Sequence, residues 1–128
     1  MRQLGLAVLV LLVSGCTPEP LYNGKPLSYW KQELLSKDPP ARWRAAATMR
    51  EVGPRARVAI PELIECLHDD EFRIVFNAAT ALGNIGPDAR EAVPELIKLQ
   101  SHPVSNVREA AAEALKKIDA DTAQEGVK

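Results

Sequence analysis

Apolar residues recur at helical spacing through the middle of the chain. One such stripe consists of Ile74, Ala78, Ala81, Leu82 and Ile85. Positions spaced this way lie on one face of a helix with about 3.6 residues per turn. No stretch of useful length alternates apolar and polar residues as a half-buried strand would. The pattern therefore predicts an all-α fold.

The helical pattern repeats at an offset of 33 residues. Residues 41–64 realign with residues 74–97, so that Gly53 falls on Gly86 and the proline after each glycine also coincides. A third, partial copy at the same offset contains Val107, Ala111, Ala112, Leu115 and Ile118. A fixed period of this length is typical of stacked helical repeats, which predicts a short solenoid.

Glycines and prolines mark where the helices of each repeat should begin and end. Gly53 and Gly86 are expected to end a helix, because glycine readily adopts the backbone conformation found just past a helix end. Pro61 and Pro94 are expected in the first turn of a second helix, where the missing N–H is not needed. Alanines should allow neighbouring helices to approach closely, namely Ala45, Ala46, Ala78, Ala79, Ala111 and Ala112.

The chain begins with an apolar run of about ten residues, Leu4 to Val13, interrupted only by Gly5. It is too short to span a bilayer, which takes about twenty residues, and is typical of a signal peptide. The tetrad Val13-Ser14-Gly15-Cys16 then resembles the bacterial lipobox. That resemblance implies a diacylglyceryl group on the Cys16 sulfur and cleavage just before it, although an ordinary secretory signal with a coincidental cysteine remains the alternative.

These features divide the chain into four parts. We expect a lipoprotein signal peptide at residues 1–15, a lipidated cysteine with a flexible linker at 16–27, a repeat domain at 28–119 and a disordered tail at 120–128. The linker prediction depends on the helix-breaking prolines and on Asn23-Gly24. By resemblance to lipoproteins, the chain would lie in the cell envelope, with Thr17 favouring the outer membrane if the cell has two membranes.

The strings "DPPARWRAAATMREVGP", "FRIVFNAATALGNIGPDAREAVPELIKL" and "VREAAAEALKKI" resemble HEAT repeats, especially the short bacterial type that also occurs in phycobilin lyases. The resemblance covers Asp38 to Asp119 and implies a right-handed α/α superhelix. The usual Val-Arg pair of such repeats is kept at Val107-Arg108, but it is lost at Ile74-Val75.

The string "NGKPLSYWKQELLS" is similar to the segment that precedes these repeats in some bacterial lipoproteins. A first helix is expected at Ser28 to Ser36 with Ser28 as its N-cap. Trp30 is expected to cover the end of the first repeat, with a role in binding as the alternative.

Composition and charge narrow the functional classes. The formal net charge is −1, and removing residues 1–15 leaves 15 basic and 17 acidic residues, a balance that does not favour nucleic-acid binding. Cys66 lies in an apolar run and is expected to be a buried, inert thiol that forms no disulfide with Cys16, the alternative being a reactive thiol.

No catalytic constellation is present. His68 and His102 are the only histidines, and the sequence has no phosphate-binding loop, zinc-type cysteine pairs or H-E-x-x-H motif. We expect no metal, no cofactor, no small-molecule substrate and no enzymatic activity. Lyase-like activity would depend on analogy of fold alone.

One candidate binding surface follows from the 33-residue offset. It aligns Trp43 with Phe76 and Glu109 on the outer face of the stacked helices. Flanked by Arg42, Arg44 and Arg73, the two aromatics would form an amphipathic patch that binds another protein. Alternatively, Trp43 covers the end helix and Phe76 packs into the groove between repeats.

The sequence thus favours a membrane-tethered interaction or scaffold module. Its rival is a structural subunit of a larger envelope assembly that stacks through its end helices around Trp30 and Leu115.

Overall fold

A computed structural model describes residues 18–119. The chain begins with two short strands and a helix, β1 (Leu21–Tyr22), β2 (Lys25–Pro26) and α2 (Leu27–Glu33). Two similar units follow: α3 (Pro39–Val52), the 3-10 helix η1 (Gly53–Ala59) and α4 (Ile60–Cys66), then α5 (Phe72–Ile85), η2 (Pro87–Ala92), α6 (Val93–Lys98) and η3 (Leu99–Ser101). The last helix is α7 (Ser105–Ile118). The all-α prediction is confirmed.

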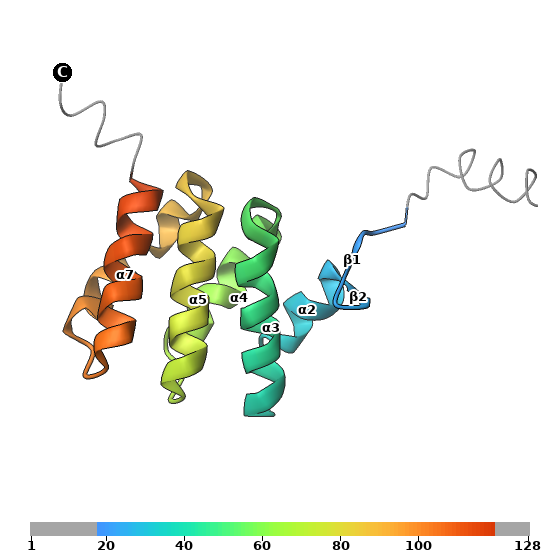
Figure 1. The fold of residues 1–128 in the computed structure, drawn as a ribbon, viewed down its shortest axis with the longest axis horizontal. Helices are drawn as coiled ribbons and strands as arrows, with labels where there is room; N and C mark the ends of the chain where they lie inside the picture. The colour runs from blue at the N-terminus through green and yellow to red at the C-terminus, as the bar shows by residue number, and fades with distance from the viewer. Residues whose placement is uncertain (1–17, 120–128) are drawn as a thin grey trace, which may run out of the picture.

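The three long helices form one layer of the molecule. Figure 1 shows α3, α5 and α7 side by side, with α4 in a second layer behind them. The central helix α5 packs against both α3 and α7. Since α5 buries its inner side against the short-helix layer and its two flanks against α3 and α7, only its outer side faces solvent. The arrangement is that of an α-solenoid, with the β1–β2 hairpin and α2 at one end and α7 at the other.

The helix boundaries follow the predicted glycines and prolines. Gly53 and Gly86 cap the C-termini of α3 and α5 with φ of 72° and 86°, in the region that favours glycine. Pro61 and Pro94 lie in the first turns of α4 and α6. These four predictions are confirmed.

Small side chains bring the long helices close together. Five of the six predicted alanines are fully buried, and Ala112 is half-buried. The helices α5 and α7 approach closely, since a Cβ added at Gly83 would lie 2.8 Å from the Cα of Ala114. Larger apolar side chains fill the space between the two layers, namely Met49, Leu63, Leu82, Leu96 and Ile118.

The N-terminal segment differs from the expected flexible linker. Leu21–Tyr22 and Lys25–Pro26 pair as antiparallel strands around Asn23 and Gly24, which both have positive φ. The Trp30 indole N–H donates a hydrogen bond to the Tyr22 carbonyl oxygen at 2.7 Å. The linker prediction is therefore wrong for residues 21–27, which belong to the folded unit.

The first helix also differs in its details. It begins at Leu27, with Pro26 at the N-cap, and ends at Glu33. The Ser28 hydroxyl donates to Glu19 at 2.9 Å, so Ser28 is not an N-cap. Trp30 is buried in the core, in agreement with a capping role. Within residues 18–119, no helix has the length and apolar character needed to cross a membrane.

Candidate interaction surface

Three aromatic side chains lie together on the outer side of α3 and α5. Trp43 on α3 is 45% exposed, Phe72 at the start of α5 is 37% exposed, and Phe76 one turn later is half-buried. All three line one shallow hollow of about 330 Å³. Of the two alternatives for this pair, Trp43 remains in solvent, whereas Phe76 packs partly against the core. We call Trp43, Phe72 and Phe76 the aromatic cluster.

Two arginines lie beside the aromatic cluster. The Arg50 guanidinium lies 5.6 Å from the centre of the Phe76 ring, and that of Arg73 lies 5.7 Å from the Phe72 ring. Both distances allow cation–π attraction, which keeps the charged groups beside the rings. Arg44 is exposed, and its predicted place beside the rings stays a prediction. The outer side of α3 and α5 is thus both apolar and basic.

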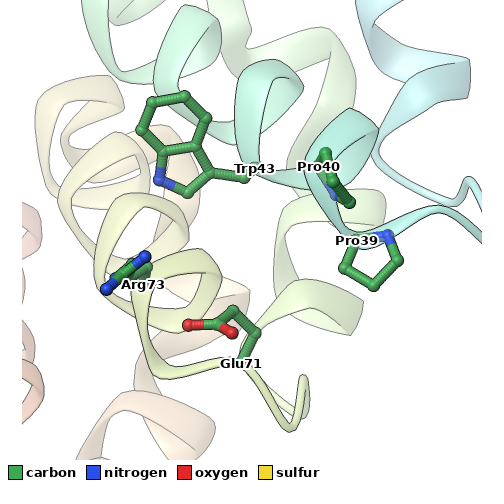
Figure 2. A pocket seen from close by; sticks show the side chains of 5 residues that line it. All are labelled: Pro39, Pro40, Trp43, Glu71 and Arg73. Carbon is green, nitrogen blue, oxygen red and sulfur yellow. The ribbon is translucent and has the colours of Figure 1, made fainter.

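A second, larger hollow adjoins the cluster. It has a volume of about 540 Å³ and is lined by Pro39, Pro40, Trp43, Glu71 and Arg73. Figure 2 shows Trp43 projecting from α3 toward the start of α5, with Arg73 and Glu71 on the other side of the space. The hollow has room for an apolar side chain of a partner against the Trp43 ring, close to the negative Glu71 and the positive Arg73.

Arg42 does not belong to this surface. Its guanidinium donates to Asp69 through Nε at 2.6 Å and through Nη2 at 3.2 Å, and to the Ser36 carbonyl oxygen at 2.9 Å. These bonds hold the side chain at the loop before α5, and Arg42 lines neither of the two hollows beside the aromatic rings. The prediction that Arg42 flanks the aromatics is wrong, because a tertiary ion pair determines its direction.

Phe72 was missed by the sequence reasoning. The 33-residue offset aligns it with Pro39 and Ser105, so no aromatic row marks its position. The available signal was its place four residues before Phe76, since residues i and i+4 share one face of a helix.

Cys66 and the histidines do not form a reactive centre. Cys66 is buried, its thiol donates to the Leu34 carbonyl oxygen at 3.4 Å, and burial raises its pKa to about 12. This confirms that the thiol is buried, and its lack of reactivity stays a prediction. His68 contacts Glu95 at 3.3 Å, and His102 accepts a hydrogen bond from the backbone of Val104. Within residues 18–119, no group of three or more His, Cys, Asp or Glu side chains could hold a metal ion.

Comparison with known proteins agrees with this architecture. The model of the HEAT repeats family matches residues 27–115 and 76–127. The chain belongs to the HEAT-repeat family. The HEAT units correspond to the stacked hairpins of the fold, which is suited to a protein-interaction or scaffold module because the stacked helices present one extended surface.

The fold is also similar to that of a solved structure. The crystal structure of an engineered protein, a Northeast Structural Genomics Consortium target, superposes with a TM-score of 0.64 and 25% sequence identity. The match covers 72% of this chain and 44% of that protein, so this chain spans less than half of the length of its structural neighbour. No curated protein matches the chain. Cys16, the signal peptide and the C-terminal tail lie outside the described residues.

Proposed function

We propose that this HEAT-repeat chain is a bacterial lipoprotein that binds a partner protein on the outer side of α3 and α5, without catalysis of its own. The lipid on Cys16 holds it in the cell envelope, in the outer membrane where the cell has two membranes. One observation carries the binding proposal. In the aromatic cluster Trp43 is 45% exposed and Phe72 is 37% exposed, and the guanidinium groups of Arg50 and Arg73 lie beside the phenylalanine rings.

Aromatic and arginine side chains are the types that contribute most to protein interfaces. Rigid aromatic rings bury much area at little entropic cost, and guanidinium groups form paired hydrogen bonds with carboxylates. The chemistry of the surface therefore fits an apolar side chain flanked by acidic residues on the partner.

The rival function, end-to-end stacking in an envelope assembly, receives less support. Trp30 at the first end is buried and Leu115 at the last end is half-buried, so neither presents the apolar contact that stacking needs. Trp43 and Phe72 are exposed on the side of the solenoid, whereas Leu21, Tyr29 and Leu35 are exposed toward its first end.

Photo-crosslinking in intact cells tests the binding proposal. A benzoyl-phenylalanine at Ala47, one turn after Trp43 on the same side of α3, should form an adduct with another protein. The same group at the exposed Ile97 should not. Trp43→Ala should weaken the Ala47 adduct, and the control Ile97→Ala should leave it unchanged. Equal adducts from both positions would contradict the assigned surface, and adducts between two copies of this chain would support stacking.

The anchor is tested by metabolic labelling with palmitate followed by membrane fractionation. Cys16→Ala should lose the label and leave the membrane fraction. Cys66→Ala, which removes the other cysteine of the chain, should keep both. Label retained in Cys16→Ala would refute lipidation at that residue.

A further inference from the structure

Charge is distributed unevenly along the solenoid. Residues 18–57 contain eight basic and four acidic side chains, a net charge of +4. Residues 58–119 contain six basic and eleven acidic side chains, a net charge of −5. The first group forms the hairpin, α2, α3 and the start of η1 at one end of the molecule, and the second group extends to α7 at the other end (Figure 1). The domain is therefore an electric dipole along its length.

The positive end carries a hollow that is both basic and apolar. Its volume is about 510 Å³, and its lining includes Tyr22, Leu27, Lys31, Arg55 and Arg57, together with Val58. Val58 is 51% exposed. We call these six residues the basic end.

The cations of the basic end are only weakly engaged within the protein. Lys31 lies 3.7 Å from Glu62, and Arg55 donates to the Tyr22 hydroxyl at 3.3 Å. Arg57 is exposed and takes part in none of the ion pairs found among residues 18–119. Glu19, the one acidic residue that lines the hollow, accepts a hydrogen bond from Ser28. A net positive charge thus remains available to an external anion.

The distance to Cys16 limits where this end can lie. Leu21, the first residue of β1, comes only five positions after Cys16. Even a fully extended chain spans at most about 3.6 Å per residue, or about 18 Å here. If a lipid on Cys16 is in the bilayer, the basic end stays close to the phospholipid headgroups, where a weak attraction is sufficient because the tether keeps the local concentration high.

We propose that the basic end lies against an anionic phospholipid surface, so that the solenoid stands on its N-terminal end with α7 away from the membrane. This inference depends on the proposed lipid anchor. The positive end is attracted to the anionic headgroups while the negative end is repelled, which leaves the aromatic cluster open to the side for a partner. Each basic residue near such a surface increases the docked population about fivefold, which corresponds to about 1 kcal/mol.

The test uses the mature lipidated protein in vesicles of phosphatidylcholine alone or with phosphatidylglycerol. A fluorophore is attached to Val58→Cys or, as a control of matched exposure, to Ile97→Cys at 53%. Buried Cys66 should not react. Energy transfer to an acceptor on the lipid headgroups reports the distance of each label from the membrane. We expect transfer from position 58 to rise with phosphatidylglycerol and to fall in 1 M salt, where the Debye length is about 3 Å. Transfer from position 97 should decrease or stay constant.

Charge reversal separates the effect of the basic end from that of the tether. Arg55→Glu with Arg57→Glu should reduce the docked population by about 25-fold or more, by removing two such contributions. Lys98→Glu with Lys116→Glu makes the same change of charge on exposed lysines at the far end and should leave docking intact.

Two results would overturn the inference, and they are distinguishable. If mass spectrometry finds no acyl chain, the proposed anchor fails and docking fails with it. If the protein is acylated and bound to vesicles, yet energy transfer from position 58 changes neither with anionic lipid nor with charge reversal, only the docking inference is wrong.

Discussion

Replacing Asp69 with alanine should destabilise the fold by about 3 kcal/mol. Both carboxylate oxygens accept hydrogen bonds from the Arg42 guanidinium, at 2.6 and 3.2 Å, and Oδ1 also accepts from the backbone N–H of Glu71 at 3.0 Å. The two side chains are 20% and 7% exposed. Removing one partner of a buried ion pair costs about 3–5 kcal/mol. The lower end applies here because Arg42 keeps its bond to Ser36.

The next repeat provides an internal control for this prediction. His102 lies 33 residues after Asp69, and its Nδ1 accepts from the backbone N–H of Val104 at 3.0 Å, as Asp69 does from Glu71. The position equivalent to Arg42 is Val75, which is buried, so the ion pair is missing. His102→Ala therefore removes a loop hydrogen bond alone, at a cost of about 1 kcal/mol. The difference between the two variants measures the ion pair, about 2 kcal/mol.

Urea denaturation of the Cys16→Ala chain gives both values by linear extrapolation. The pH dependence has a defined sign. Burial opposes ionisation of Asp69, but the bonds from Arg42 and Glu71 together lower its pKa. A lowered pKa stabilises the fold above the carboxyl's unfolded value of about 3.9 and loses this effect as the pH falls through the folded value. The free energies of unfolding of the Asp69→Ala protein and of its parent should therefore converge in acid. Equal costs for Asp69→Ala and His102→Ala, or a gap that persists in acid, would refute the reasoning.

Three further predictions concern the backbone, the buried thiol and the first helix. Gly86→Ala should lower the free energy of unfolding by about 1–3 kcal/mol, because φ of 86° with ψ of −147° is almost restricted to glycine, and urea denaturation measures this loss. Cys66 in the Cys16→Ala chain should resist iodoacetamide at pH 8 and react only after unfolding, because its thiol pKa is about 12; mass spectrometry of the native protein would show any alkylation that contradicts this. Trp30→Phe should cost about 1 kcal/mol through the lost hydrogen bond to Tyr22, and hydrogen exchange should show faster exchange in the β1–β2 hairpin, whereas unchanged exchange would mean that the bond does not hold the hairpin.

The sequence is sufficient to predict the solenoid because its repeat is encoded locally. Helical periodicity, glycine after a helix and proline at its first turn each act within a few residues. These signals agree in both complete units, so α3 to α6 can be predicted from the sequence alone. The same periodicity leaves two positions open for Trp43, and the structure shows that its ring is 45% exposed.

Sequence reasoning fails where contacts cross between units. The direction of Arg42 depends on Asp69, 27 residues later, and no local pattern contains that pair. The hairpin at residues 21–26 resembles a linker in sequence because its strands have only two residues each. Its turn, Asn23-Gly24, is nevertheless a strong hairpin signal, and the prolines around it obscure that signal.

Comparing rows of the repeat separates residues required for folding from those available for binding. The buried row of Ala45, Ala78 and Ala111 has the same residue in every unit, because the helices can approach only over small side chains. The outer row runs Trp43, Phe76 and Glu109. Because the third unit has glutamate at this position, an aromatic ring is not required there for folding. Phe76 packs partly against the core, whereas the exposed ring of Trp43 is better explained by something outside the fold.

Trp43→Glu tests that argument, because it places on α3 the residue that the third unit already carries on α7. Full burial of a large side chain contributes about 1.5–3 kcal/mol, and Trp43 is 45% exposed, so the variant should stay folded with a loss of about 1–2 kcal/mol. The adduct from the crosslinker at Ala47 should nevertheless disappear. Ala78→Glu, in the buried row, should prevent folding altogether, because an unpaired charge would be buried. If Trp43→Glu unfolded the protein as Ala78→Glu is expected to do, the Trp43 ring would be part of the core. That result would contradict the assignment of the aromatic cluster as a binding surface.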